Sequence, residues 1–249
     1  MKLPFLLSVP HAGLIIPEEV QDICILGEDD IIKDGDEGAA EIYFPLKSSV
    51  ARMISTNIAR AIIDMNRGED DRRKDGIIKT HTCWDIPVYS KSPSEEIIQS
   101  LIRRYYHPYH RDITEISKGL KLGIDCHTMA AKGPPVGPDS GIERPYICLS
   151  NGNGTCTREW IESMAACMEK TFCSKVSINY PFKGGYIIHS HANELPWIQL
   201  EISRAQFFSN AEKSRLLFES LSDWYLGKDA FLNNSILDSP TDMGQDPLS

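Results

Sequence analysis

The sequence predicts a single α/β domain with a mixed, largely buried β-sheet flanked by helices. Three observations lead to this prediction. Apolar strand-like runs alternate with segments of helical periodicity through most of the chain. The 249 residues can form one sizeable core, and no internal repeat divides them. Polar sequence with scattered Pro and Gly occurs only at the end, so we expect residues 1–226 to form the domain and residues 227–249 a loosely ordered tail.

The first part of the chain predicts strands and one short helix. The apolar run "PFLLSV" is typical of a buried strand and ends at the turn "PHAG". "DEGAAEIYFPL" begins with acidic residues, which suit the start of a helix. "SSVARMIS" and "ARAIIDM" predict two further strands, and the charged segment "NRGEDDRRKDG" predicts a surface loop after them.

A long helix is predicted for the middle of the chain. Ser92, Pro93 and Glu95 combine capping-box spacing with a proline at the first helical position. The helix continues through "SEEIIQSLIRRYYHPYHRDITEISKG", and we expect it to bend at Pro108. His107 and His110 lie three residues apart around this proline, which favours a packing role over metal binding.

The second half predicts five strands and two helices. The strand-like runs are "KLGIDC", "YICLS", "KVSIN", "GYIIHS" and "WIQLEIS", with a Gly/Pro-rich loop over residues 131–145. "TREWIESMAACMEKTF" has apolar residues at helical spacing, and a capping box of Ser209 and Glu212 starts a final helix through Trp224. The glycine pair of "PFKGGYI" stands before a predicted strand, so it does not predict a phosphate loop.

The composition excludes several classes of partner. A formal charge of −9 and a pI near 5.3 argue against nucleic-acid binding and favour small ligands. No run approaches the roughly 18 apolar residues of a membrane span, and "MKLPFLLSVPHAG" predicts a first strand rather than a signal peptide. The seven cysteines are scattered without a C-x-x-C pair, which is typical of a reducing compartment. We therefore expect a cytoplasmic protein without nucleic-acid or membrane partners; a monomer and a homo-oligomer are both open.

Two histidines and two aspartates stand where a metal site could form. His11 and His127 each follow a strand-like run, and Asp34 and Asp36 follow a short apolar patch. Two imidazoles and one carboxylate leave the fourth position of a tetrahedral zinc ion open, as in catalytic sites, and water there can attack an amide carbonyl. The alternative is structural, because a single histidine at a strand end more often caps a turn or bonds a carbonyl. Spacing alone leaves both interpretations open.

The motif "DCHTM" places a thiol directly before His127. Neighbouring strand residues point to opposite faces, so Cys126 and His127 cannot readily form a nucleophile–base pair. We expect Cys126 to pack in the core and Asp125 to share the face of His127. A serine nucleophile is not predicted, because the sequence contains no G-x-S-x-G elbow.

Two further segments contain polar candidates. Glu201 lies inside the mostly apolar "WIQLEIS", where an acid must be paired, bound to a metal or protonated. A raised pKa would suit a general base; a salt bridge to Arg204 or exposure on an edge strand is the structural alternative. Asn66 and Arg67 follow a predicted strand in "DMNRG". The guanidinium could clamp a carboxylate, or both residues could lie in a solvated turn.

In their order along the chain, the motifs resemble those of the N-formylglutamate amidohydrolases, also called formylglutamate deformylases. Each motif is short, but eight of them in the same order through most of the chain make a specific match. The family is similar to the zinc carboxypeptidases, which implies their α/β fold around a mixed sheet. The motifs are "SVPHAG", "DGDEGAAEIY", "AIIDMNRGEDD", "RYYHPYHRDI", "IDCHTM", "NGNGTC", "PFKGGYI" and "WIQLEIS".

The resemblance implies a zinc-dependent reaction. One zinc ion per chain would be held by His11, His127 and Asp36, with Asp34 as the alternative carboxylate. Glu201 would be the general base and then the proton donor to the leaving amine. The substrate would be a small acidic N-acyl amino acid, N-formyl-L-glutamate above all, cleaved to formate and glutamate.

The resemblance also implies roles around the metal. Asn66 and Arg67 would bind a substrate carboxylate, and Asp125 would orient a metal ligand. Family members typically contain "GGW-I-T-R-H-Y-G", whereas this chain has "GGYIIHSHA", which puts His189 in the place of an arginine. Two alternatives stay open: a carboxypeptidase-like amidase that acts on a peptide or cell-wall fragment, and a non-catalytic binding protein of the same fold.

Overall fold

The computed structural model describes residues 2–136 and 139–237. Its centre is one six-stranded sheet with the strand order β2-β1-β3-β6-β4-β5. Neighbouring strands are parallel except for β4 and β6, so the sheet is mixed, as predicted. The strands are β1 (Leu3–Val9), β2 (Val50–Ser55), β3 (Leu122–Met129), β4 (Ile147–Ser150), β5 (Val176–Ile178) and β6 (Trp197–Ser203).

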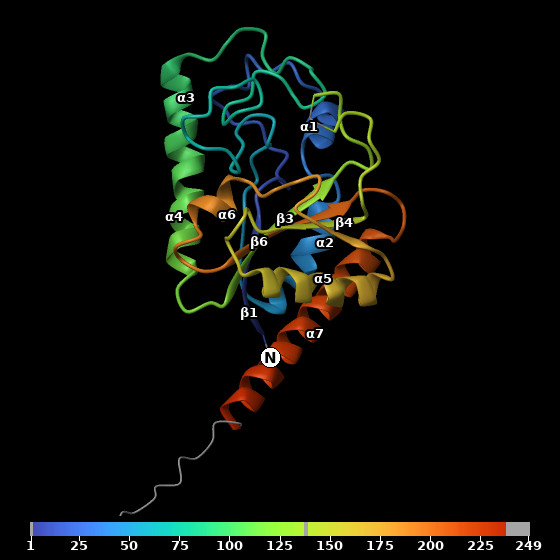
Figure 1. Cartoon of the computed structure of the whole chain (residues 1–249). Helices are drawn as coiled ribbons and strands as arrows, with labels where there is room; N and C mark the ends of the chain where they lie inside the picture. Colours follow the sequence, from blue (N-terminus) through green and yellow to red (C-terminus); the bar gives the residue numbers. More distant parts are fainter. Residues whose placement is uncertain (1, 137–138, 238–249) are drawn as a thin grey trace, which may run out of the picture.

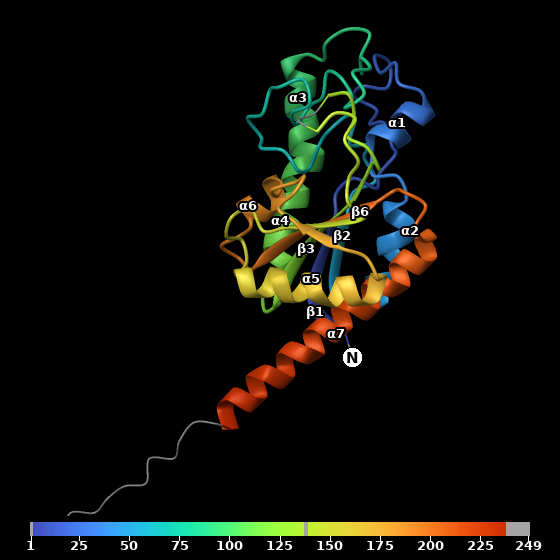
Figure 2. The same cartoon turned by 45° about the vertical axis from the view of Figure 1, so that its right-hand side comes forward.

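Helices cover both faces of the sheet (Figures 1 and 2). One face packs against a rod made of α3 (Glu95–Leu101), a π-helical turn (Ile102–Tyr106) and α4 (His107–Ile116). The other face packs against α2 (Ala39–Tyr43), α5 (Arg158–Phe172) and α7 (Asn210–Leu237). Two short helices, α1 (Glu28–Asp34) and α6 (Tyr186–Ser190), and the 3-10 turn Phe44–Ser48 lie in the connections. Within the described residues, no helix combines the length and apolarity needed to cross a membrane.

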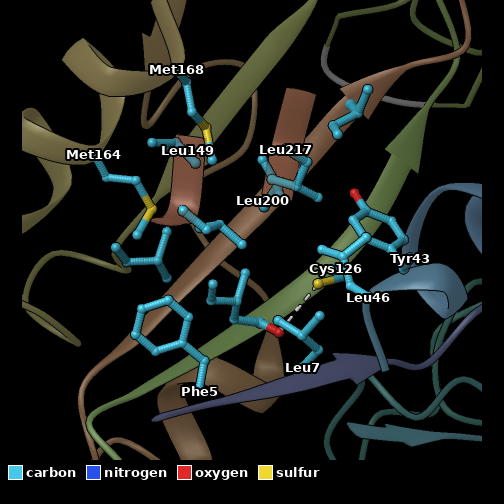
Figure 3. Packing of buried hydrophobic residues seen from close by; sticks show 14 of the residues in the cluster. Phe5, Leu7, Tyr43, Leu46, Cys126, Leu149, Met164, Met168, Leu200 and Leu217 are labelled. Atoms are coloured by element: carbon cyan, nitrogen blue, oxygen red, sulfur yellow. Dashed lines mark hydrogen bonds between the residues drawn. The ribbon is translucent and has the colours of Figure 1, made fainter. Parts of the chain in front are cut away.

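The central strands β3 and β6 separate an apolar core from a polar site. Cys126 and Leu200 are register partners and point into the core that the sheet forms with α5 and α7 (Figure 3). The thiol therefore packs in the core, as strand alternation predicted. Side chains one position along point to the opposite face, and there His127 and Glu201 are register partners.

Two segments that were predicted as strands are not strands. Residues 59–65 form buried turns, and their apolar run fits burial on all sides, which periodicity alone does not distinguish from a strand. "GYIIHS" contains the helix α6, where the adjacent Ile187 and Ile188 are both fully buried. A strand would send two adjacent side chains to opposite faces. The glycine pair thus precedes a short helix, with Gly185 as its N-cap.

The middle helix differs from the prediction in its start and in its form. α3 begins after Ser94, whose hydroxyl accepts a hydrogen bond from the Ile97 N–H at 3.4 Å, so the cap is Ser94 and not Ser92. The helix continues through Pro108, and the π-helical turn stands just before it, where the missing N–H interrupts the α-helical hydrogen-bond pattern.

The last helix starts as predicted and extends further. Ser209 and Glu212 form the capping box, with the Ser209 N–H donating to the Glu212 carboxylate at 3.0 Å. α7 continues past Trp224 to Leu237, into the segment expected as a tail. An isolated glycine such as Gly227 costs a helix only about 1 kcal/mol, which the rest of the helix tolerates. Residues 238–249 of the expected tail lie outside the described residues.

Candidate metal and catalytic site

The candidate residues meet at the carboxyl ends of the parallel strands, where open α/β sheets place their sites. His11 follows β1, and His127 and Glu201 lie near the ends of β3 and β6. Asp36 follows α1, and its backbone N–H donates to the His11 carbonyl at 3.0 Å. This backbone hydrogen bond joins the segment that contains His11 to the segment that contains Asp36.

His11, Asp36 and His127 form one buried cluster of metal-ligating atoms. The Nδ1 atoms of the two histidines are 3.1 Å apart. The Asp36 Oδ2 atom lies 3.0 Å from Nδ1 of His127 and 3.6 Å from Nδ1 of His11. Nitrogen and oxygen ligands about 2.0–2.2 Å from a tetrahedral zinc ion are roughly 3.3–3.5 Å from one another. The three atoms therefore fit a divalent metal ion of this kind.

The outer nitrogens of both histidines face buried carboxylates. Nε2 of His11 is 2.7 Å from Asp64, and Nε2 of His127 is 2.8 Å from Asp125. Each carboxylate accepts the imidazole N–H, which leaves the Nδ1 lone pair directed at the centre of the cluster. Asp125 lies on the face of His127, as strand alternation predicts, whereas Asp64 is a site residue that the sequence motifs do not predict. The only sequence signal for Asp64 was an acid at the end of the apolar run "ARAII".

Arg60 balances the charge of two aspartates, the candidate ligand Asp36 and the Asp64 that contacts His11. Its Nε donates to Asp64 at 3.1 Å, and its Nη1 lies 3.6 Å from Asp36. Burial alone would raise the pKa of Asp64, but His11 and Arg60 bring it well below its ordinary value. Burial likewise opposes the ionisation of Asp36, and the neighbouring His11 and His127 hold its pKa well below the ordinary range. Both carboxylates are therefore ionised at neutral pH.

Glu201 is buried beside this cluster and lines the same cavity. The amide of Gln199 donates to its Oε1 at 2.9 Å. Burial raises the pKa of Glu201 to about 7, an effect that the charge of Asp36 reinforces and that His127 and Arg60 oppose. The alternative partner Arg204 instead donates to the Thr128 hydroxyl at 3.1 Å and to nearby carbonyls. The carboxyl group can therefore gain and lose a proton near neutral pH.

Asn66 and Arg67 both line the cavity, but they are held differently. The Asn66 amide donates to Asp125 at 3.1 Å and accepts from the Ile187 N–H at 2.8 Å, so it braces the wall behind His127. Arg67 donates to the carbonyl and carboxylate of Asp75 at 3.0 and 3.3 Å. A guanidinium has five N–H donors, so Arg67 retains donors beyond those two.

Asp34, the alternative carboxylate, lies in a separate buried pair. Lys79 donates to its Oδ2 at 2.8 Å, and the Cys83 N–H donates to its Oδ1 at 2.7 Å. Burial opposes ionisation, but Lys79 and Arg60 lower the pKa of Asp34 below its ordinary value. The structure thus brings Asp36, and not Asp34, to the histidines.

The cavity has a volume of about 300 Å³ and is basic, although the chain as a whole carries a charge of −9. Five acidic side chains line it: Asp34, Asp36, Asp75, Asp139 and Glu201. Seven basic ones do so: Lys33, Arg60, Arg67, Lys79, Arg144, Lys183 and Arg204. His189 is absent from the lining; it is exposed on α6 with its ring over Gly152. The excess of basic groups favours an anionic ligand.

Fold and site together define a class of protein. A largely parallel sheet that brings a buried His–Asp–His cluster and a carboxyl group of raised pKa into one cavity has the parts that a metal-dependent hydrolase uses. The chain belongs to the N-formylglutamate amidohydrolase family, because the model of that family matches residues 3–208.

Relatives of known name support this assignment. The chain is 26% identical over 229 residues to N-formylglutamate deformylase of Pseudomonas putida, which covers 85% of this chain and 84% of the relative. It is 25% identical over 259 residues to N-formylglutamate deformylase of Pseudomonas aeruginosa, covering 90% and 94%.

Two solved structures share the fold. The N-formylglutamate amidohydrolase from Ralstonia eutropha JMP134 has a TM-score of 0.73 and 19% sequence identity, and the match covers 94% of this chain and 95% of that one. A gene product from Agrobacterium tumefaciens also has a TM-score of 0.73, with 18% identity, and the match covers 91% of each chain.

Proposed function

We propose that this protein is a zinc-dependent amidohydrolase that cleaves the formyl amide of N-formyl-L-glutamate to formate and glutamate. The observation that carries the proposal is the cluster of His11, Asp36 and His127, whose ligating atoms lie 3.0–3.6 Å apart in the cavity that Glu201 also lines. The two relatives named N-formylglutamate deformylase support the substrate.

The metal would be held by Nδ1 of His11, Nδ1 of His127 and Oδ2 of Asp36. When bound, a zinc ion supplies Lewis-acid chemistry, which acidifies water and polarises a carbonyl group. Asp64 and Asp125 keep both Nδ1 lone pairs directed at the metal by accepting the opposite N–H of each ring. Burial opposes the charged form of His127, but Asp125 and Asp36 raise the pKa of this ring well above its ordinary value, so a metal ion that binds Nδ1 would displace a proton.

Glu201 would act first as the general base and then as the general acid of the reaction. As a carboxylate it takes a proton from the attacking water while the water oxygen bonds to the formyl carbon. It then gives that proton to the amide nitrogen, so that the C–N bond breaks and formate and glutamate separate. A pKa of about 7, which burial produces, suits a group that must both accept and donate. The Gln199 amide fixes the orientation of the carboxyl group.

The basic cavity suits a substrate with two carboxylates. Arg67 lies on its wall next to Asn66, and its remaining N–H donors can bind the α-carboxylate of the amino acid. That contact would hold the formyl group toward the metal ligands. The amide of Asn66 already forms hydrogen bonds with Asp125 and with the Ile187 N–H. Asn66 would therefore position these two residues and not bind the substrate itself.

The test is formate release coupled to metal analysis. The purified protein should contain about one zinc ion per chain and release formate from N-formyl-L-glutamate. A chelator should abolish release, and added zinc should restore it. A panel of short peptides and cell-wall fragments tests the carboxypeptidase-like alternative. Release of amino acids from that panel without formate release would overturn the proposed substrate. A protein that binds no metal and has no activity would overturn the proposal that it is a metal-dependent enzyme.

A further inference from the structure

One basic side chain of the cavity, Lys183, has no partner of any kind among the described residues. Four of its seven basic side chains form ion pairs with aspartates at 3.3 Å or less. Lys33 stacks on the Trp84 ring, and Arg204 lies 3.7 Å from Asp36 and donates to Thr128. Lys183 makes no hydrogen bond, ion pair or ring contact with any residue that the structure describes. It is therefore the basic group most available to an anionic ligand.

The loop that carries Lys183 is fixed on both sides of this residue. The Phe182 carbonyl accepts a hydrogen bond from the Ser150 hydroxyl of β4 at 2.7 Å. The Gly185 N–H donates to Gln199 of β6 at 2.6 Å. A Cβ atom on Gly185 would lie 2.3 Å from the Asn66 amide, so the backbone approaches the site as closely as glycine allows. The backbone of Lys183 is thus held at the cavity, and only its long side chain is free to move.

We propose that Lys183 binds the side-chain carboxylate of the substrate and sets the preference for acidic N-acyl amino acids. This rests on the proposed function. Glutamate presents two carboxylates, and Arg67 accounts for the one next to the amide. The other basic groups already share their charge with an aspartate or an aromatic ring, so among the described residues Lys183 offers the second carboxylate an unshared positive charge. An ammonium group has three donors in no fixed plane, which tolerates a flexible carboxylate.

The test compares N-formyl-L-glutamate with N-formyl-L-glutamine, which has the same size and the same α-carboxylate but a neutral side chain. Lys183→Met should lower kcat/KM for the glutamate compound by about tenfold or more, mainly through KM, since a hydrogen bond to a charged group is lost. Its kcat/KM for the glutamine compound should stay unchanged. Lys183→Arg should retain most of the preference. Lys175→Met is the matched control, because Lys175 is 95% exposed and lies outside the cavity.

Each outcome decides the inference. An equal loss on both compounds would assign Lys183 to the α-carboxylate or to the loop structure, and no loss on either would remove it from the site; both overturn the proposal. If the wild-type protein releases formate from neither compound, the proposed function fails. Calorimetric binding to zinc-loaded Glu201→Gln, with and without Lys183→Met, then decides: a loss of affinity for N-formyl-L-glutamate alone supports the proposal, and no such difference overturns it.

Discussion

His127 and Glu201 lie opposite each other on the neighbouring parallel strands β3 and β6. Register partners in a sheet point to the same face, so the pairing of β3 with β6 places a candidate metal-binding imidazole beside a buried carboxyl group. The next pair along, Cys126 and Leu200, points into the apolar core. The register of β3 and β6 therefore determines which side chains face the core and which face the site. A shift of either strand by one residue would turn its core residues toward the site and its site residues toward the core.

Glu201→Gln should lower kcat by about 10²–10⁴-fold, the usual contribution of a general acid–base group. Glutamine has the same shape but cannot take the proton of water. Its zinc content should equal that of the wild type, because Glu201 is not part of the ligand cluster. Glu143→Gln is the control, since Glu143 is exposed and pairs with Lys132 at the surface. Near-wild-type turnover of Glu201→Gln would refute the assigned base.

The pH dependence of kcat/KM should show an acid limb that belongs to Glu201. Burial raises the pKa of this group to about 7, and the carboxylate form is the active one, so activity falls as the pH drops through the pKa. A bound metal ion adds positive charge and lowers the pKa, which places the limb at or below pH 7. Glu201→Gln should lack this limb in its residual activity. A limb that persists in the variant would belong to another group.

The resemblance in motif order predicted His11, Asp36 and His127 as metal ligands, and the structure brings the candidate ligating atoms to within 3.0–3.6 Å of one another. Asp64 escaped prediction, because which buried carboxylate meets the outer nitrogen of His11 depends on the path of residues 59–65. Those residues have the periodicity of a strand but form buried turns. The failure at α6 has the same cause: adjacent buried isoleucines do not distinguish a short helix from a strand without their tertiary surroundings.

Asp36→Asn and Asp34→Asn should have opposite effects on metal binding and on stability. Asp36→Asn removes a ligating oxygen charge and should lower the zinc content. Asp34→Asn leaves Lys79 buried without its partner, which should cost roughly 3–5 kcal/mol of unfolding free energy, but the variant should still bind zinc when folded. Metal analysis and denaturant unfolding measure both. If only Asp34→Asn lost zinc, Asp34 and not Asp36 would be the metal ligand.

Asp64→Asn should weaken zinc binding about 10–100-fold, the usual cost of losing an outer carboxylate partner of a ligand. Asp64 accepts from His11 at 2.7 Å and from Arg60 at 3.1 Å, so its charge both orients the imidazole and balances the guanidinium. Competition with a chromophoric chelator measures the affinity directly, without turnover. Asp75→Asn is the control, because Asp75 binds Arg67 at the rim. Equal affinities of Asp64→Asn and the wild type would leave Asp64 without a role at the metal.

His110 should make the protein less stable in acid. Its Nε2 donates to the Met65 carbonyl at 3.0 Å, and its Nδ1 lies 2.9 Å from Nε2 of His191. Burial, reinforced by the charges of His191 and His107, lowers the pKa of His110 to about 4, whereas the Met65 carbonyl and Asp125 oppose the shift. The unfolded chain, with a histidine pKa near 6.5, therefore binds the proton first.

The lower pKa of His110 in the folded protein determines how stability changes with pH. The folded-state pKa lies below the unfolded one, so the stabilisation is complete above about pH 6.5 and is lost as the pH falls toward 4. The difference corresponds to roughly 3 kcal/mol. The unfolding free energy of His110→Gln, measured by denaturant between pH 7.5 and pH 4.5, should start lower than that of the wild type but fall less steeply. His107→Gln should keep the wild-type slope, because His107 is 47% exposed and pairs with Glu69. If the two curves ran parallel, the pKa of His110 would not differ between the folded and the unfolded protein, and the prediction would be wrong.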